Sequence, residues 1–267
     1  MVKLYISTFN NDVSWIKKGI PIEVGADIRD TFRYELRDNT GDNISGENAY
    51  FGELTGLYWI WKNEHFEDSD VIGFCHYNKC LDITPEIAGD LIKKNPSVKW
   101  ICSDTTEILA HDYLSDIKAI EQVLKENYPL YFDAWTRLYD SNGASRDNNC
   151  YPMQLFYTTK YELDRYCEFL FGVLFKVRDY IGEVDRTSYH KRYCAFLGER
   201  LLSVYILENK CEIVCIKRKT NKKMVRKLMH NLSFLGRVSF LHNIYLQFRN
   251  SSVFERYLDE EKSSWKK

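Results

Sequence analysis

The fold is decided by the stretch Val71-Ile-Gly-Phe-Cys-His-Tyr-Asn-Lys79. Its first five residues are apolar or small, as in a buried β-strand, and they are followed at once by polar and titratable side chains. In α/β enzymes, reactive groups lie at the carboxyl ends of such strands, where the sheet borders a crevice. The pattern therefore predicts a central strand over 71–75 that brings His76, Tyr77 and Lys79 to the edge of a sheet.

Other segments alternate between strand and helix patterns. Short runs rich in β-formers predict strands at 3–8, 20–25, 99–102, 152–159 and 212–216. Apolar residues at helical spacing predict helices at 45–65, 111–127, 161–181 and 192–207. A turn-rich stretch over 138–149 predicts a mobile active-site loop. This order favours an α/β fold with a mostly parallel central sheet flanked by helices.

Composition limits the classes of partner. The chain has 267 residues, enough for one large domain and a tail, and we place the domain at 1–216 and the tail at 217–267. Lys and Arg total 37 and Asp and Glu total 38, and the net charge of −1 offers no overall field for nucleic acid. No run reaches the about 18–20 apolar residues needed to span a bilayer, and no leader pattern opens the sequence. These features predict an intracellular protein that does not span a membrane.

Eight cysteines lie mostly within apolar segments, without a C-x-x-C pair. We expect them to be reduced, buried thiols. Cys75 precedes His76, but adjacent strand residues point to opposite faces, which argues against a Cys–His nucleophile pair.

The tail begins with seven cations among residues 217–227, followed by an apolar stretch at helical spacing. A basic run beside an amphipathic helix is typical of proteins that bind anionic lipid surfaces. The tail is therefore predicted to be a membrane-binding helical extension. The alternative is a solvated basic turn followed by a helix that packs back on the domain.

Two carboxylates in the loop Asp38-Asn-Thr-Gly-Asp-Asn43 are candidate ligands for sugar or ribose hydroxyls, because an ionised carboxylate accepts several hydrogen bonds. Gly41 allows a tight turn between Asp38 and Asp42. The alternative is a loop in which Asp and Asn side chains only cap turns.

The residues after the central strand suit a diphosphate. His76 can carry a proton or position a phosphate, Tyr77 can stack or donate, and Lys79 can neutralise charge. A structural role for His76 is the alternative. The chain has no D-x-D motif for a cation-bound nucleotide, and residues 103–107 are a poor acidic substitute. Phosphate-loop, dinucleotide, metalloprotease and serine-hydrolase motifs are also missing.

Within the predicted helix at 192–207, Glu199 and Arg200 interrupt an apolar face beside Gly198. A carboxylate in such surroundings can act as a general base. It can equally be held in an ion pair by Arg192, Arg200 or another cation.

In order along the chain, several strings resemble a bacterial family described as domain of unknown function 4422, found among capsular and exopolysaccharide biosynthesis proteins. The strings that carry the resemblance lie at 22–26, 38–45, 50–62, 72–77, 166–171 and 196–202. The chain departs from the family's pattern at Asn78-Lys79, where the pattern has Arg-Arg, and at residues 151–154, where it has His-Met-Phe-Asn.

The resemblance implies a GT-A-like glycosyltransferase domain, of the hexosyltransferase type. Glu199 and His76 are the implied catalytic residues, with Glu199 as the base. The expected substrate-binding residues are Thr8, Asp38, Asp42, Asn43, Tyr77, Lys79, Gln154 and Arg200. No metal ligand is assigned, and a divalent cation, Mn²⁺ or Mg²⁺, stays open as a cofactor despite the missing D-x-D.

The expected reaction moves a sugar from a nucleotide-diphosphate donor, with a UDP-sugar favoured, to a lipid-linked oligosaccharide. The expected location is the cytoplasm, with peripheral binding to the inner face of the plasma membrane through the basic tail. The alternative function is a non-catalytic module that binds sugar nucleotides or glycans within a polysaccharide assembly complex. A membrane-assembly scaffold, based on the tail alone, is a third hypothesis.

Overall fold

The computed structural model describes residues 1–221. Its strands are β1 (Val2–Thr8), β2 (Gly19–Glu23), β3 (Val71–His76), β4 (Lys79–Leu81), β5 (Val98–Ser103), β6 (Phe156–Thr159), β7 (Glu212–Ile216) and β8 (Arg218–Thr220). Its α-helices are α1 (Asn48–Phe51), α2 (Leu54–Asn63), α3 (Pro85–Lys94), α4 (Leu114–Asn127), α5 (Pro129–Leu138), α6 (Lys160–Ile181), α7 (Ser188–Lys191) and α8 (Tyr193–Glu208). Two short 3-10 helices are η1 (Ala26–Ile28) and η2 (Ser45–Glu47).

The sheet is mostly parallel, as predicted. Its strand order is β2-β1-β3-β6-β5-β7, and β4 and β8 extend it beside β3. β1 is parallel to β2 and β3, and β5 is parallel to β7. β6 runs antiparallel between β3 and β5. The parallel strands therefore all end at one edge of the sheet, which we call the carboxyl edge, and β6 begins there.

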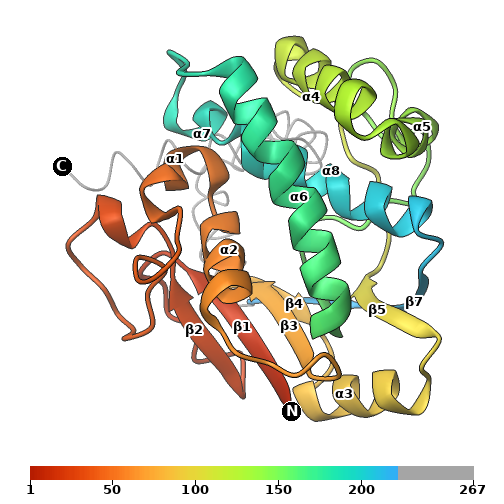
Figure 1. Cartoon of the computed structure of the whole chain (residues 1–267). Coiled ribbons are helices and arrows are strands. Elements are labelled where there is room, and N and C mark those ends of the chain that lie inside the picture. The colour runs from red at the N-terminus through yellow and green to blue at the C-terminus, as the bar shows by residue number, and fades with distance from the viewer. Residues whose placement is uncertain (222–267) are drawn as a thin grey trace, which may run out of the picture. The chain divides into compact units, whose positions relative to one another are not determined.

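Helices cover both faces of this sheet (Figure 1). α2, α6 and α8 pack on one face, whose side chains include Phe74, Trp100 and Phe156. α3 packs on the other face through Ala88 and Ile92. Burial of such large apolar side chains contributes about 1.5–3 kcal/mol each, so the α6 side carries most of the stability of the domain.

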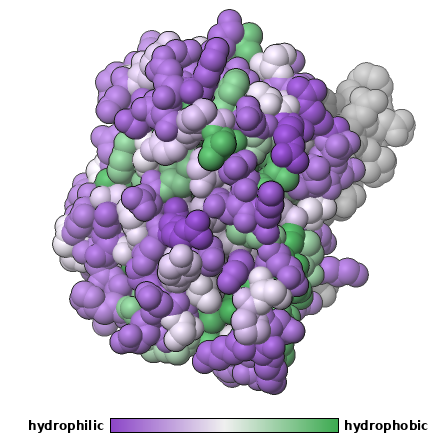
Figure 2. Space-filling view, turned by 45° about the vertical axis from the view of Figure 1, so that its right-hand side comes forward, coloured by the Kyte–Doolittle hydropathy of each residue, from purple (hydrophilic) through white to green (hydrophobic). Residues whose placement is uncertain are grey.

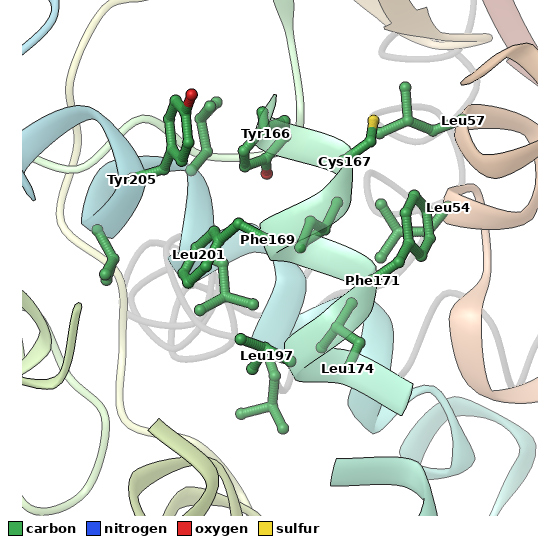
Figure 3. Close-up of a cluster of buried hydrophobic side chains, with 14 of the residues drawn as sticks. Leu54, Leu57, Tyr166, Cys167, Phe169, Phe171, Leu174, Leu197, Leu201 and Tyr205 are labelled. Carbon is green, nitrogen blue, oxygen red and sulfur yellow. The ribbon is translucent and has the colours of Figure 1, made fainter. Parts of the chain in front are cut away.

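The helix α6 forms the centre of the larger core (Figure 3). Thr159 caps its first turn by accepting a hydrogen bond from the Glu162 N–H. Phe171 faces α2, whereas Phe169 and Tyr205 meet on the α8 side with ring centres 6.0 Å apart. One long helix thereby fixes the positions of α2 and α8 relative to the sheet.

The predicted helix at 45–65 is broken. The structure replaces it with η2, α1 and α2, because Gly52 adopts φ 54° and ψ −130°, a conformation that side chains with a Cβ rarely adopt. The Asn48 side chain donates to the Gly52 carbonyl at 2.6 Å and replaces the interrupted helical bonds. Helical spacing alone does not reveal this break. Its consequence is that Glu53 comes to lie at the carboxyl edge.

The predicted strand at 152–159 is shorter than expected. Met153 and Gln154 have positive φ values of 67° and 49°, so regular pairing starts only at Phe156. Two consecutive non-glycine residues in this region are uncommon and are maintained only where surrounding contacts hold them.

Two helices of ordinary length were not predicted, α3 and α5. Each begins with a proline in its first turn, Pro85 or Pro129. The loop predicted at 138–149 follows directly after α5. It is held in place, because Tyr139 and Ser145 form a β-bridge and the Gly143 carbonyl accepts a hydrogen bond from Arg200 at 2.9 Å.

All eight cysteines are free thiols, as expected. Six are buried, but Cys211 is only partly buried and Cys215 is exposed, so the expected burial was wrong for these two. Cys75 packs in the core on the α3 side of the sheet. Within residues 1–221 no helix is both long and apolar enough to cross a bilayer. The face shown in Figure 2 is largely hydrophilic, with hydrophobic residues in small separate groups. Residues Met1–Lys219 form one compact unit, and most of the predicted basic tail lies outside the described residues.

We expect Gly52→Ala to lower the free energy of unfolding by about 1–3 kcal/mol, because alanine is strained at this backbone conformation. Its Cβ would also lie 3.2 Å from Arg192 Nε. Gly46→Ala is the control, since a Cβ there has no neighbour within 4 Å, and it should change stability by less than about 0.5 kcal/mol. Urea unfolding of both variants measures the difference, and equal effects would contradict this account of the helix break.

Candidate functional site

His76 ends β3 at the carboxyl edge with one ring nitrogen unused. Its Nε2 is buried and has no hydrogen-bond partner. Burial lowers the pKa of His76; the Glu53 carboxylate opposes this shift, and the nearby cations Lys79 and Arg192 add to it. The ring also hydrogen-bonds to the Met153 backbone, which favours protonation, so the ring is the donor in that bond. The neutral ring then presents Nε2 as a hydrogen-bond acceptor.

The ends of β3 and β5 bring polar side chains to the same face of the sheet. Phe74 and Cys102 both lie opposite Phe156. His76 and Asp104 lie two residues beyond Phe74 and Cys102, so strand alternation places both on the sheet face covered by α2, α6 and α8. Their strands are separated by β6, which corresponds to about 10 Å. Asp104 Oδ1 is also buried without a hydrogen-bond partner.

The break between α1 and α2 supplies a carboxylate to this edge. Glu53 is nearly buried and pairs with Arg192, with 3.2 Å between Oε2 and Nη2. Arg192 immediately precedes α8. The pair therefore joins the start of α2 to the start of α8, directly beside His76.

The segment that enters β6 is held by one buried amide. Gln154 donates from Nε2 to the Gly198 carbonyl on α8 at 2.8 Å and accepts from the Tyr166 hydroxyl on α6 at 2.8 Å. Both partners are buried, so the loss of either bond would leave an unsatisfied group, at a cost of about 1–3 kcal/mol. The predicted substrate contact of Gln154 stays a prediction, since its amide binds α6 and α8.

Glu199 lies on the edge-facing side of α8. Helical spacing places it in line with Arg192 and Ser203. Arg192 pairs with Glu53, and Ser203 Oγ accepts a hydrogen bond from the Tyr151 N–H at 2.8 Å. Glu199 therefore sits between two contacts that α8 makes with the carboxyl edge, and it is half-buried. This position is compatible with its predicted role as a base.

Arg200 points away from that line into the protein. Its guanidinium donates to three backbone carbonyls, those of Leu109, Gly143 and Phe196, at 2.8–2.9 Å. Burial lowers the pKa of Arg200. The residue fixes two loops against α8, and its predicted contact with a substrate stays a prediction.

Asp38 is fully buried and holds the turn that follows β2. Its carboxylate accepts from the backbone N–H groups of Gly25 at 2.9 Å and Ala26 at 3.0 Å, and from Ser45 Oγ at 2.5 Å. The Asp38 N–H also donates to the Glu23 carbonyl. We refer to these contacts as the Asp38 lock. They are the turn-capping contacts that formed the alternative interpretation of this loop.

Asp42 does not lie beside His76. It accepts a hydrogen bond from the Tyr58 hydroxyl at 3.0 Å, and its backbone is bonded to the side chain of Asn63 at the end of α2. His76 lies instead near Glu53, which precedes α2. The ten residues of α2 span about 15 Å. The expectation that the loop carrying Asp42 and the end of β3 face one cavity was therefore wrong.

Asn43 and Thr8 make local turn contacts. Asn43 bonds the Gly41 carbonyl and the Ser45 N–H. The buried Thr8 accepts from the Asn11 N–H at 2.9 Å at the end of β1. Neither contact tests substrate binding.

Tyr77 and Lys79 lie just beyond His76. The Tyr77 backbone is fixed by Ser7 and by Trp15, whose indole N–H donates to the Tyr77 carbonyl at 2.8 Å. The Tyr77 side chain packs with the core on the α3 side, opposite His76. Lys79 Nζ lies 3.0 Å from Met153 Sδ.

A stack of alternating rings and guanidinium groups borders the carboxyl edge near β1 and β2. The Arg29 guanidinium lies 4.4 Å from the Phe9 ring centre and 4.8 Å from that of Phe32, and Arg37 lies 4.0 Å from Phe32. Glu23, fully buried at the end of β2, accepts from Arg29 Nη2 at 2.5 Å. Phe9 is 41% exposed, so one ring face at this edge stays accessible.

No three-ligand metal cluster is formed by the described part of the chain. Residues 1–221 contain no group of three or more His, Cys, Asp or Glu side chains that could hold one metal ion. Glu53 is a carboxylate close enough to His76 to influence its pKa. Dependence on a divalent cation stays a prediction.

Sequence reasoning missed several residues of this edge. Glu53 was hidden inside a pattern interpreted as one helix, and Glu23 inside an apolar strand. A lone acid within an apolar run is the signal that could have identified both, because buried carboxylates need partners. The residues of the arginine–phenylalanine stack have no regular spacing in the sequence, so no periodic pattern could have identified them.

The mostly parallel sheet, its helical layers and a polar site at the carboxyl edge define an α/β protein with a GT-A-like fold. The chain belongs to the family described as Domain of unknown function (DUF4422), and the match spans residues 4–210.

Among solved structures, the chain is similar to the apo structure of the bifunctional glycosyltransferase WbbM, with a TM-score of 0.67 and 22% sequence identity. The similarity covers 82% of this chain and 45% of WbbM, so this chain corresponds to less than half of that protein. The predicted fold class is confirmed. No match to a curated protein was found.

We expect Asp38→Asn to lower the free energy of unfolding by about 1–3 kcal/mol, because the amide NH₂ would face a donor in the Asp38 lock. Asp42→Asn is the matched control. Its side chain accepts one hydrogen bond at an exposed position, so the loss should stay below about 1 kcal/mol. Guanidinium unfolding measures both, and a larger effect at Asp42 would overturn the assignment of the lock.

The depressed pKa of His76 has a consequence for stability at low pH. An unfolded histidine takes up a proton as pH falls through about 6.5, whereas the folded His76 resists protonation to a lower pH. The folded state therefore loses stability as pH falls below about 6.5. His76→Gln should reduce this loss in urea unfolding at pH 7.5, 6.5 and 5.5. His111, whose pKa burial also lowers, contributes equally to both proteins. Parallel pH profiles for the two proteins would refute this expectation.

Proposed function

We propose that this protein is a glycosyltransferase that moves a sugar from a nucleotide-diphosphate donor to a hydroxyl of a saccharide acceptor. The GT-A-like fold and the similarity to WbbM support this class. One observation carries the proposal: a desolvated acceptor nitrogen, His76 Nε2, lies between cations and carboxylates at the carboxyl edge. Ligands of α/β proteins bind at this edge of the sheet.

The cations suit the departing diphosphate. Lys79 and Arg192 are both close enough to His76 to influence its pKa. Fixed positive charge in a partly desolvated site stabilises the negative charge that develops on a leaving group. His76 Nε2, an acceptor when neutral, is better suited to a sugar hydroxyl than to a phosphate oxygen, because the phosphate oxygen is itself an acceptor.

Glu199 is the proposed base. It is half-buried on α8 between Arg192 and Ser203, and a carboxylate in this position can remove the proton of an incoming acceptor hydroxyl. Asp104, with its buried unpartnered Oδ1, is the second carboxylate at the edge and would orient hydroxyl groups. The positions of Glu199 and Asp104 support an acceptor that approaches from the α8 side.

Phe9 provides a place for the nucleobase. Its ring is exposed on one side and is backed by Arg29, and base–aromatic stacking is worth about 1–3 kcal/mol. A UDP-sugar remains the favoured donor. The Asp38 lock would act indirectly, by fixing the Gly25–Ala26 turn beside this surface.

The wider role follows the resemblance seen in the sequence. We place the reaction in capsular or exopolysaccharide assembly, with a lipid-linked oligosaccharide as acceptor. The proposed location is the cytoplasmic surface of the membrane, with the basic tail as the contact to anionic lipid.

Donor turnover tests the proposal directly. The full chain is incubated with UDP-, GDP-, CMP- and dTDP-sugars and a mixture of lipid-linked oligosaccharides, with Mn²⁺ or with a chelator, and release of the nucleotide is measured. Glu199→Gln should lower kcat about 10²–10⁴-fold, the range for loss of a general base. Glu208→Gln, a change at the far end of the same helix, should leave kcat within about twofold of the unmodified protein, since surface changes of this kind are worth little.

Each outcome has a separate meaning. Unchanged turnover in Glu199→Gln would remove the assigned base while leaving the transferase class intact. Donor binding without turnover would favour the non-catalytic sugar-nucleotide module. If no nucleotide diphosphate raises the melting temperature, the proposed class itself fails, because a bound ligand at one hundred times its Kd adds about 2.7 kcal/mol of stability.

A further inference from the structure

A hollow lies between α1 and the end of α6. Its volume is about 630 Å³. One wall is formed by Glu47 and Phe51, and the other by residues of α6 and by Gly182-Glu183. We call it the α1–α6 pocket. Phe51 lies two residues before Glu53, so the pocket and the carboxyl edge flank the same helix break.

The polar side of the pocket is pre-organised around one guanidinium. Arg178 is fixed between Glu47, at 2.9 Å, and Glu183, at 2.6 Å, and it lies 3.8 Å from the ring centre of Tyr50. The Tyr50 hydroxyl also donates to Glu183. This bond, together with Arg178, lowers the pKa of Glu183, which stays ionised at neutral pH. The polar groups are thus held in place before any ligand arrives.

These carboxylates retain capacity to accept further hydrogen bonds. The side chain of Glu47 is 45% exposed and that of Glu183 is 77% exposed. An ionised carboxylate has about four acceptor positions, and the contacts above use only some of them. The remaining positions face solvent, where the hydroxyl groups of a ligand can reach them.

The pocket also has an aromatic wall, formed by Phe51 and Phe175. The rings of Phe51 and Phe175 meet edge to face with centres 5.7 Å apart. Phe175 is only half-buried and is supported from behind by Tyr58 and Phe171. Phe51 is itself buried, so Phe175 presents the exposed apolar surface of this wall.

The charge of the pocket excludes an anionic ligand. Three carboxylates, of Glu47, Asp179 and Glu183, stand against one cation, Arg178. A phosphate or diphosphate would be repelled by this excess of negative charge. A sugar ring is neutral, with an apolar C–H face for the aromatic wall and a rim of hydroxyls for the carboxylates and the guanidinium. A pocket of this size is also within the range of small-molecule sites.

We propose that the α1–α6 pocket binds a saccharide unit of the acceptor, one or more residues away from the sugar that reacts at the carboxyl edge. The inference rests on the proposed glycosyltransferase function. It assigns the acceptor to the side of the site where α1 packs against α8, and the donor to the β1–β2 side. The pocket would select acceptors by their glycan and would leave donor binding unaffected.

The test uses variants that fill or strip the pocket without touching the carboxyl edge. Asp179→Trp places a large ring in the pocket from an exposed position on α6, and Glu183→Ala removes an exposed acceptor. Asp185→Ala removes a nearby exposed carboxylate outside the pocket and serves as the control. The probes are two neutral oligosaccharides, a β-linked glucose pentamer and a β-linked N-acetylglucosamine pentamer, and a mixture of lipid-linked oligosaccharides.

We expect Asp179→Trp and Glu183→Ala to raise the Kd for a bound oligosaccharide, or the KM for the lipid-linked acceptor, at least about tenfold, the effect of one lost charged hydrogen bond. The shift in melting temperature caused by nucleoside diphosphates should stay unchanged in both variants, and Asp185→Ala should behave as the unmodified protein. Unchanged saccharide affinity in Asp179→Trp, or no saccharide binding by the unmodified chain, would overturn the pocket assignment. Loss of donor turnover with intact saccharide binding would instead count against the transferase proposal.

Discussion

The buried amide of Gln154 is the contact on which the carboxyl edge depends. It joins the start of β6 to α6 through Tyr166 and to α8 through the Gly198 carbonyl. The left-handed backbone of Met153 and Gln154 is tolerated because these bonds hold it. Through this single residue, the imidazole of His76 and the carboxylate of Glu199 keep a fixed relation, although they belong to a strand and a helix far apart in the chain.

The charged and titratable groups of this part of the protein have two different roles, one in shaping loops and one at the site. Glu23, Asp38 and Arg200 are buried and bonded to backbone groups, so they shape loops. Glu53 and Arg192 form an ion pair whose charges act on His76, and His76 Nε2 is left unsatisfied. Unsatisfied buried polar atoms are rare in native structures, and they concentrate where a ligand completes the bonding.

The strand that ends in His76 was predictable because its apolar run and its abrupt polar end are both local signals. Gly52 breaks the predicted long helix, and that break depends on φ at one residue, which hydrophobic spacing does not report. The placement of Asp42 failed for a different reason. The loop's position is set by side chains of α2 such as Asn63, a tertiary contact that sequence order does not encode. Residues that reach the carboxyl edge at the end of a strand could be predicted from the sequence. Residues whose position depends on a helix break or on side-chain contacts that hold a loop could not.

The position of the antiparallel strand β6 also bears on the order in which the sheet can fold. Among the strands of residues 1–221, it alone pairs with both the half-sheet β2-β1-β3 and the half-sheet β5-β7, and it is followed in the chain by β7. Until Thr159 has left the ribosome, the free backbone groups along β3 have no partner strand, and an open strand edge is a template for intermolecular pairing. Folding of β2-β1-β3 ahead of β6 would leave the β6-facing side of β3 open to pairing with another chain.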